Sequence, residues 1–151
     1  MTDWTVLPPG LPGPEDDGAG ARLLGLTFPK VTLDDEDGRP VSLPPPAGGR
    51  TVVFVFPMTG GPGVATLPGW DAIPGARGCT AEACAFRDLA ADLAAAGADR
   101  LYGLSTQTAE HHREASERLH LPYRLLSDSS GGLAAFGLPT FAAAGGCSTA
   151  V

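Results

Sequence analysis

The run RTVVFVFP, residues 50 to 57, constrains the fold more than any other stretch of this chain. From Thr51 to Phe56 it is a continuous run of β-branched and aromatic residues, which predicts a central strand that is buried on both faces. Residues 58 to 78, which come next, are rich in Gly and Pro and predict a long loop. Residues 80 to 97 are rich in Ala and Leu with apolar positions near the helical period, and they predict a helix. A buried strand followed by a helix favours an α/β fold.

Further strand and helix patterns alternate on both sides of this pair. Before it, short apolar runs at 31 to 33 and 40 to 43 flank Asp37-Gly38, a dipeptide typical of a β-hairpin. After it, the sequence predicts a strand at 99–105, a polar amphipathic helix at 108–120, a strand at 122–128, a short helix or turn at 129–137, and a strand at 138–141 that a Gly145-Gly146 turn returns as a hairpin through Val151. This order predicts an α/β sandwich around a central sheet.

The composition limits the domain count and the partners. Residues 1 to 22 are rich in Pro, Gly and Asp, so we expect a flexible arm before one domain that spans 23 to 151. Of the 151 residues, 43% are hydrophobic, which is enough for a core. The net charge of −7, without a basic cluster, argues against nucleic acid and anionic membranes as partners. The sequence shows neither a signal-peptide pattern nor an apolar run of membrane-spanning length, so we expect a soluble, cytoplasmic protein.

Two cysteines, Cys79 and Cys84, stand near the start of the predicted helix in RGCTAEACAFRD, residues 77 to 88. In an intact helix, residues at this spacing have Cα atoms roughly 8 to 9 Å apart, beyond the ~7 Å limit for a disulfide. Two interpretations stay open. Both thiols are small core side chains, or they form a bond only after the first turns of the helix unwind.

The position of Cys79 favours a reactive thiol. Free N–H groups and the dipole at a helix N-terminus stabilise a thiolate, so we expect the pKa of Cys79 to be lowered. Arg77 and Arg87 would add positive potential, whereas Glu82 in the same turn would oppose it. Cys84 lies deeper in the helix among apolar residues, and we expect it to be buried and unreactive at rest. This asymmetric pair suits oxidation of Cys79 to a sulfenic acid and attack by Cys84.

The stretch GCTAEACAFRD, residues 78 to 88, resembles the active-site helix of the Q-type peroxiredoxins, the bacterioferritin comigratory protein group. VTLDDEDGRPVSL is similar to the first hairpin of that family, TVVFVFP to the strand before its peroxidatic loop, YGLST to its next strand, and LPYRLLSD to a later strand. The resemblance spans residues 25 to 141. It implies a thioredoxin-like fold in which helices flank a central mixed β-sheet, with an N-terminal β-hairpin.

The resemblance also implies an activity, in which Cys79 is the peroxidatic thiol and Cys84 the resolving thiol of a peroxidase. The enzyme would reduce hydrogen peroxide or organic hydroperoxides through a Cys79 sulfenic acid. The Cys79–Cys84 disulfide would then be reduced by thioredoxin or a similar dithiol. We expect no metal or organic cofactor, and we expect a monomer or a weak homodimer.

The loop before the first cysteine departs from the pattern of the family, which is Pro-x-x-x-Thr-x-x-Cys. Ala72 and Ala76 occupy the Pro and Thr positions here. We therefore infer an insertion in the loop, with Pro57 and Thr59 folding back over the site to replace them. The hydroxyl of Thr80 is a further candidate for binding the peroxide.

The arginine that the family places before its late Thr-Phe strand is also missing, because Leu138 and Pro139 stand there. Arg77 and Arg124 are the candidates to replace its guanidinium, and either fits a solvated surface charge equally well. The sequence stops at Val151, before the terminal strand and helix of the family. We therefore expect a short C-terminal part. Either a partner or the N-terminal arm covers the sheet edge, or the chain is a fragment, because an uncovered edge favours aggregation.

Two other functions stay open on the sequence alone. One is a non-enzymatic redox-sensing module, a peroxiredoxin that has lost its peroxidase activity along with the missing residues. The other is a protein thiol–disulfide oxidoreductase. Pro139-Thr140 favours the latter, because it is similar to the cis-Pro–Thr element opposite the redox cysteine of thioredoxins.

The remaining chemical candidates are weaker. His111, His112 and His120 lack a carboxylate or cysteine at a ligand spacing, so we expect surface histidines and no metal site. Trp70, in the long loop, is a lid over the cysteine pocket or an anchor for the loop, and we favour the anchor. Cys147 stands among glycines and small residues, and we expect it to take no part.

Overall fold

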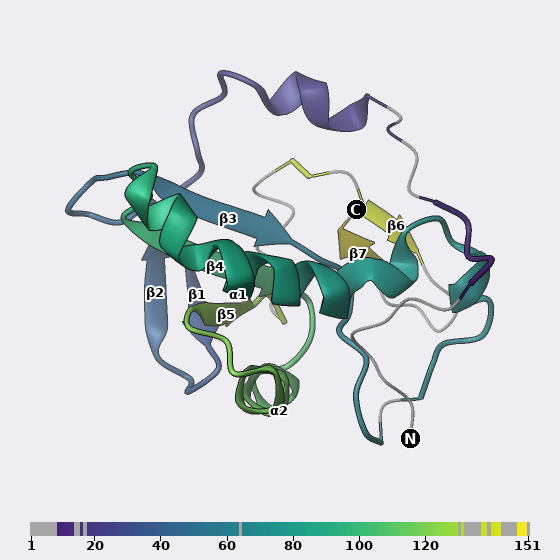
Figure 1. The fold of residues 1–151 in the computed structure, drawn as a ribbon. Coiled ribbons are helices and arrows are strands. Elements are labelled where there is room, and N and C mark those ends of the chain that lie inside the picture. Colours follow the sequence, from purple (N-terminus) through teal and green to yellow (C-terminus); the bar gives the residue numbers. More distant parts are fainter. Residues whose placement is uncertain are drawn as a thin grey trace.

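The structure is a computed structural model that describes residues 9–13, 16, 18–63, 65–129, 131, 137–138, 140–142 and 148–150. Its main element is a five-stranded sheet with the order β2-β1-β5-β4-β3 (Figure 1). The elements are η1 (Ala19–Leu23), β1 (Val31–Asp35), β2 (Pro40–Leu43), β3 (Thr51–Val55), η2 (Trp70–Ala72), η3 (Ala76–Gly78), α1 (Cys79–Ala95), β4 (Arg100–Ser105), α2 (Ala109–Leu119), β5 (Arg124–Ser127), β6 (Thr140–Ala142) and β7 (Ser148–Ala150), where η marks a 3-10 turn.

The sheet is mixed, as the sequence predicts. β1 and β2 form the antiparallel hairpin that Asp37-Gly38 indicates, with Gly38 at a φ of 75°. β1 also pairs antiparallel with β5, whereas β5 with β4 and β4 with β3 run parallel. Because parallel strands end at the same edge of a sheet, the segments after β3, β4 and β5 meet there.

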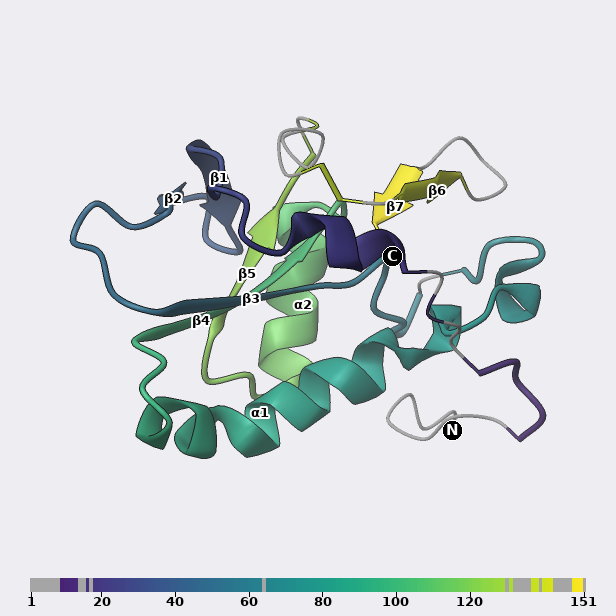
Figure 2. The ribbon, with the colours of Figure 1, turned by 90° about the horizontal axis from the view of Figure 1, so that it is seen from above.

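The two faces of the sheet carry separate cores. On one face, side chains of β3 and β5 pack with α1 and α2, in a cluster of Phe54, Phe56, Cys79, Ala115, Tyr123 and Leu125. On the other face, side chains of four strands form a cluster of Leu33, Leu43, Leu104 and Leu126. In Figure 2, α1 lies on one side of β3 and β4, and the β6–β7 pair lies on the other. The sheet is flanked by helices as expected, and α1 and α2 both pack against the same face.

Two predictions about the strands were wrong in part. β3 is not central, because β4 and β5 both add on the same side of it; it ends the strand order, and of its residues only Phe54 is buried. The predicted terminal hairpin is confirmed as β6 and β7, but these two strands form a sheet of their own rather than joining the main one. The short helix or turn predicted at 129–137 lies mostly outside the described residues.

The helix ends match local signals. α1 is followed by Gly97 at a φ of 94°, a conformation that glycine adopts without strain. At the start of α2, the side chain of Thr108 accepts a hydrogen bond from the backbone N–H of His111. In the described part of the chain, neither helix combines the length and apolar character needed to cross a membrane.

His112 is buried, which corrects the expectation of three surface histidines; His111 and His120 are exposed. The reason is helical spacing, because His112 lies on the same buried face of α2 as Ala115 and Leu119. Its Nε2 atom shares a 2.7 Å hydrogen bond with Ser105 Oγ, and its buried Nδ1 atom has no hydrogen-bond partner among the described residues. Burial, aided by the charge of neighbouring His111, lowers the pKa of His112 to about 4.

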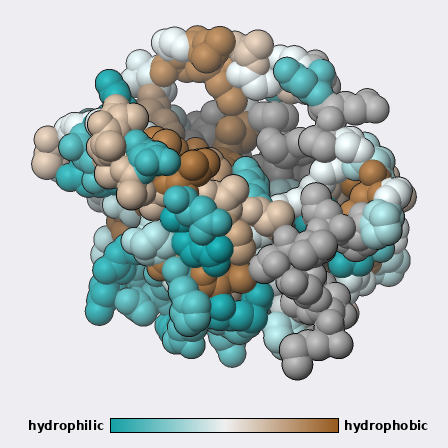
Figure 3. All heavy atoms as spheres, viewed as in Figure 1, coloured by the Kyte–Doolittle hydropathy of each residue, from teal (hydrophilic) through white to brown (hydrophobic). Residues whose placement is uncertain are grey.

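The N-terminal segment leaves apolar side chains in solvent. Leu24, Leu26 and Phe28, which come after η1, are 83%, 65% and 38% exposed. In Figure 3, hydrophobic residues gather over this part of the surface, at the top of the view. Residue 22, where we expected the arm to end, falls inside η1.

Gly103, in the middle of β4, offers a test of the core. An added Cβ would lie 2.6 Å from Leu125 Cδ2, 2.8 Å from Phe54 Cζ and 3.1 Å from Phe56 Cε1. We expect Gly103→Ala to lower the free energy of unfolding by about 1–3 kcal/mol, because the packed side chains must shift. Chemical denaturation measures the loss. Gly20→Ala is the control, since its Cβ would meet nothing within 4 Å, and equal stability of the two variants would contradict this packing.

The buried histidine predicts a pH dependence of stability. The folded pKa of His112, about 4, lies below its ordinary value of 6.5, so the folded state binds fewer protons between these values. Its contribution is therefore complete above pH 6.5 and falls as the pH drops to 4, by on the order of 3 kcal/mol. We expect His112→Gln to flatten the loss of unfolding free energy across this window, measured by denaturation at several pH values. The exposed His120, which is not among the causes of this shift, should keep the dependence of the unmodified protein when it is changed to Asn.

Candidate active site

Cys79 is the first residue of α1, where the chain returns to the sheet after the long loop that begins at the end of β3. The turn η3 leads directly into the helix, and Gly78 stands at its N-cap position without a capping side chain. In Figure 1, this end of α1 lies beside the end of β3. The sequence predicted this placement, and the helix begins one residue before the predicted Thr80.

The thiol of Cys79 is closed off from solvent. Its residue is 3% exposed, and the side chain packs with Phe54 and Phe56 of the sheet and with Ala115 of α2. The thiol donates a 3.5 Å hydrogen bond to the carbonyl oxygen of Ala76. This geometry fits a protonated thiol with the Ala76 carbonyl as its acceptor.

The expected lowering of the Cys79 pKa is not found in this state. Burial raises the pKa of Cys79 from 9.0 to about 11, and the nearby Glu82 adds to the rise. The backbone groups of Met58 and of Cys79 itself act in the opposite direction by hydrogen bonding to the sulfur, as expected for a helix start. In the closed site, the loss of solvent therefore affects the pKa of Cys79 more strongly than the helix start does. The amides that would stabilise a thiolate are nevertheless in place.

Thr59 lies buried in the segment after β3, and Gln107 holds it there. The backbone N–H and the hydroxyl of Thr59 donate to Gln107 Oε1 at 2.9 and 3.1 Å, and Gln107 Nε2 donates to the carbonyl oxygen of Thr59 at 3.3 Å. Gln107 is held in turn, since its backbone N–H donates to Ser105 Oγ and its carbonyl accepts from Ser127 Oγ. The ends of β4 and β5 thus fix the loop after β3.

Gly60 fastens the same loop to both helices. Its N–H donates to Thr80 Oγ1 of α1 at 3.2 Å, and its carbonyl oxygen accepts from Arg118 Nη2 of α2 at 2.8 Å. Arg118 also forms an ion pair with Glu114. Thr80 is buried and Pro57 is half-buried, so three of the predicted substrate-binding residues, Pro57, Thr59 and Thr80, lie in or against the segment whose Met58 backbone reaches the Cys79 sulfur.

The two arginines proposed for the missing guanidinium lie elsewhere. Arg77 binds the carboxylate of Asp71 through two hydrogen bonds, of 2.6 and 3.1 Å, in an exposed ion pair. Arg124, at the start of β5, pairs with the buried carboxylate of Asp35 beside the β1–β2 hairpin. Both side chains are therefore engaged in ion pairs away from the thiol, and the arginine that does contact the loop is Arg118.

Cys84 is buried as predicted, at 8% exposure, and packs with Ala83, Leu119 and Leu121. Both Cys79 and Cys84 are free thiols within the unbroken helix α1. Their Cα atoms are therefore roughly 8 to 9 Å apart by helical geometry, and a bond between the sulfurs requires the helix to unwind locally.

Gln107 and Arg118 were missed by the sequence reasoning. Gln107 had a signal, because it is a polar residue two positions after a strand of a parallel set, where site residues gather. Arg118 had none, since its spacing from Glu114 is that of an ordinary pair on a solvated helix face. Its contact with Gly60 depends on how α2 packs against the loop.

Trp70 is an anchor for the long loop, as favoured from the sequence. It is 3% exposed, packs with Ala76, and its Nε1 donates to the carbonyl oxygen of Ala76 at 3.1 Å. Among the described residues, no three His, Cys, Asp or Glu side chains gather to hold a metal ion. Pro139, the side chain of Thr140, and Cys147 lie outside the described part of the chain.

Known proteins are similar to this chain in both sequence and fold. The Redoxin family matches residues 23–148. The chain is 38% identical over 104 residues to the chloroplastic peroxiredoxin Q of Sedum lineare, a match that covers 69% of this chain and 47% of that protein. The chain spans about half the length of the curated relatives it matches.

Solved structures share the fold. Peroxidoxin BcpB of Mycobacterium tuberculosis is 31% identical, with a TM-score of 0.60 over 81% of this chain and 70% of that chain. Peroxiredoxin Q of Xanthomonas campestris is 21% identical, with a TM-score of 0.59 over 80% of this chain and 68% of that chain. The thioredoxin-like fold expected from the sequence is confirmed.

The contacts of Gln107 predict how the thiol is kept closed. Gln107→Ala removes three hydrogen bonds to Thr59, so we expect the loop to loosen and Cys79 to be alkylated several-fold faster, since each such bond is worth about 0.5–1.5 kcal/mol. Alkylation is followed by peptide mass, which separates Cys79 from the other cysteines. Arg77→Ala, which removes only an exposed ion pair, should leave the rate unchanged. An unchanged rate in Gln107→Ala would show that the clamp does not cover the thiol.

Proposed function

Because the chain belongs to the redoxin family, with relatives among the Q-type peroxiredoxins, we propose that it is a thiol-dependent peroxidase. Its substrates are hydrogen peroxide or organic hydroperoxides, and its reductant is thioredoxin or a similar dithiol. The observation that carries the proposal is the placement of two free thiols in one helix, with Cys79 at the first residue, beside the ends of parallel strands.

The first step is attack by the Cys79 thiolate on the O–O bond of the peroxide. The S–O bond forms as the O–O bond breaks, giving a sulfenic acid and an alcohol or water once the leaving oxygen takes a proton. In the closed state the pKa of about 11 keeps the thiol protonated, so peroxide and water must enter. Entry of water removes the cause of the raised pKa, which is burial, and leaves the amides of Met58 and Cys79 to stabilise the anion.

Pro57, Thr59 and Thr80 are the residues we propose to line the peroxide site. Two of them supply hydroxyl groups beside the helix start, where charge develops on the leaving oxygen. Arg77 is left out, because its guanidinium is paired with Asp71. Arg118 contributes by holding Gly60, and so the loop, against α2.

The second step joins the two cysteines. The Cys84 sulfur attacks the Cys79 sulfenic sulfur, an S–S bond forms, the S–O bond breaks, and hydroxide leaves as water. A dithiol reductant then exchanges with the disulfide and returns both thiols. The electrons come from thiols throughout, so the cycle needs no metal or organic cofactor.

One observation favours a second function, a redox sensor without peroxidase turnover. Cys79 is buried with a raised pKa, and a thiol of this kind reacts slowly with peroxide. The rate decides between the two: a rate with peroxide near that of free cysteine supports the sensor, and a much faster one supports the enzyme.

We also propose a reducing compartment such as the cytoplasm, and a monomer or weak homodimer. The low count of three cysteines supports the compartment, because structural disulfides are rare in a reducing environment. The net charge of −7 supports the absence of nucleic acid and anionic membrane partners. Cell fractionation and sedimentation test the compartment and the assembly state.

The activity is tested by substitution of each thiol. Purified protein with a dithiol should consume hydrogen peroxide, Cys79→Ser should abolish consumption, and Cys84→Ser should stop after one turnover, since it can form the sulfenic acid but not the disulfide. Intact mass after one equivalent of peroxide should show the loss of two hydrogens, mapped to a Cys79–Cys84 bond. Cys147→Ser is the control and should keep full activity. Equal activity of the unmodified protein and Cys79→Ser would rule the proposal out.

A further inference from the structure

Disulfide formation in the proposed cycle depends on how easily the first turns of α1 unwind. Cys84 packs with Ala83 of its own helix and with Leu119 and Leu121, and it has to leave this cluster to reach Cys79. Any contact that fixes the turn around Cys84 therefore slows the second step and prolongs the life of the sulfenic acid. The structure contains one such contact that comes from the sheet.

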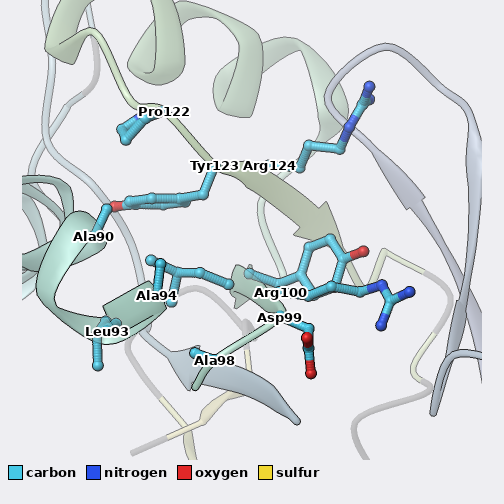
Figure 4. A pocket seen from close by; sticks show the side chains of 11 residues that line it. Ala90, Leu93, Ala94, Ala98, Asp99, Arg100, Pro122, Tyr123 and Arg124 are labelled. Carbon is cyan, nitrogen blue, oxygen red and sulfur yellow. The ribbon is translucent and has the colours of Figure 1, made fainter. Parts of the chain in front are cut away.

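Tyr123 makes this contact from the residue before β5. Its hydroxyl donates a buried 2.7 Å hydrogen bond to the carbonyl oxygen of Ala83, in the peptide unit that joins Ala83 to Cys84. In Figure 4 the Tyr123 side chain extends from the strand to α1, with its hydroxyl end at the helix. Ala83 is fully buried, so this carbonyl lies inside the protein.

Aromatic packing restrains the ring of Tyr123 and so restrains the position of its hydroxyl. The ring lies in a T-shaped arrangement with Phe54 in β3 at 5.6 Å between centroids, and Phe54 stacks on Phe86 of α1 at 4.0 Å. Tyr123 is 8% exposed and belongs to the same core cluster as Cys79. The phenol is thus positioned by the sheet and acts on the helix.

Tyr123 also borders a groove that is open to solvent, so water can replace the carbonyl of Ala83 as the partner of its hydroxyl once the turn unwinds. One side of Tyr123 lines an open groove of about 310 Å³, together with Ala90 and Ala94 of α1 and Pro122 (Figure 4). When the turn at Cys84 unwinds, water from the groove offers the hydroxyl another acceptor. The bond therefore shifts the balance between the wound and unwound turn without locking it.

We propose that Tyr123 is a positioning residue for the disulfide step: its hydroxyl holds the turn that carries Cys84 and sets the rate at which Cys84 reaches oxidised Cys79. The inference rests on the proposed function. Another hydrogen bond, from Arg87 Nη1 of α1 to the carbonyl oxygen of Leu119 of α2 at 3.0 Å, holds α1 one turn further on. The first turn itself is held by Gly60, through the side chain of Thr80, and by Tyr123, whose hydroxyl alone binds the carbonyl next to Cys84 among these contacts.

Tyr123→Phe tests the inference, because it removes the hydroxyl and keeps the ring. After one equivalent of hydrogen peroxide, rapid quenching and mass analysis track the sulfenic acid and the Cys79–Cys84 disulfide. We expect disulfide formation about two- to tenfold faster than in the unmodified protein, from the ordinary worth of one hydrogen bond. Oxidation of Cys79 itself should keep its rate, and less sulfinic acid should accumulate at high peroxide, since the sulfenic acid lives for a shorter time.

Tyr102→Phe is the matched control, since Tyr102 lines the same groove but packs with the core on the other face of the sheet. It should leave the disulfide rate unchanged. Amide hydrogen exchange of residues 80–84 in the reduced protein gives a second readout without peroxide, and Tyr123→Phe alone should lower protection there.

The outcomes separate the two proposals. If the unmodified protein forms no Cys79–Cys84 disulfide, the proposed function fails, and hydrogen exchange still tests the hold on the helix. If the disulfide forms and Tyr123→Phe matches the unmodified protein in rate and in exchange, the role of Tyr123 is overturned. Equal acceleration by Tyr102→Phe would also overturn it, as a general loosening of the core.

Discussion

The parallel pairing of β3, β4 and β5 brings three strand ends to one edge of the sheet, and the candidate site is built from the segments next to those ends. After β3 comes the segment of Pro57 to Gly60, and after β4 comes Gln107, which holds that segment. The helix start with Cys79 packs beneath them. Without this parallel pairing, the loop after β3, the side chain of Gln107 and the thiol of Cys79 would not lie together.

Burial and reactivity oppose each other at Cys79. Packing against Phe54 and Phe56 excludes solvent, and this exclusion raises the pKa of the thiol. The same packing sets the amides of Met58 and Cys79 beside the sulfur. In the proposed cycle, entry of water would convert this closed arrangement, with its protected thiol, into an opened one in which the same amides stabilise the thiolate.

Burial and reactivity are also opposed at Cys84, the proposed resolving thiol. An intact α1 keeps Cys84 buried and out of reach of Cys79, so stability of the helix start and speed of disulfide formation vary in opposite directions. Contacts from the sheet and from α2, such as the hydrogen bonds of Tyr123 to Ala83 and of Arg118 to Gly60, therefore bear on the proposed chemistry.

Local patterns in the sequence determined the hairpin, both helices, the strands and the two thiols of α1, because turn dipeptides, apolar periods and a cysteine motif act over a few residues. Only the tertiary structure decided that β3 lies at an edge, that His112 is buried, and that Gln107 and Arg118 hold the loop. It also decided that burial raises the pKa of the Cys79 thiol. These properties depend on contacts between residues far apart in the chain, and burial, which sets the pKa, has no local signal.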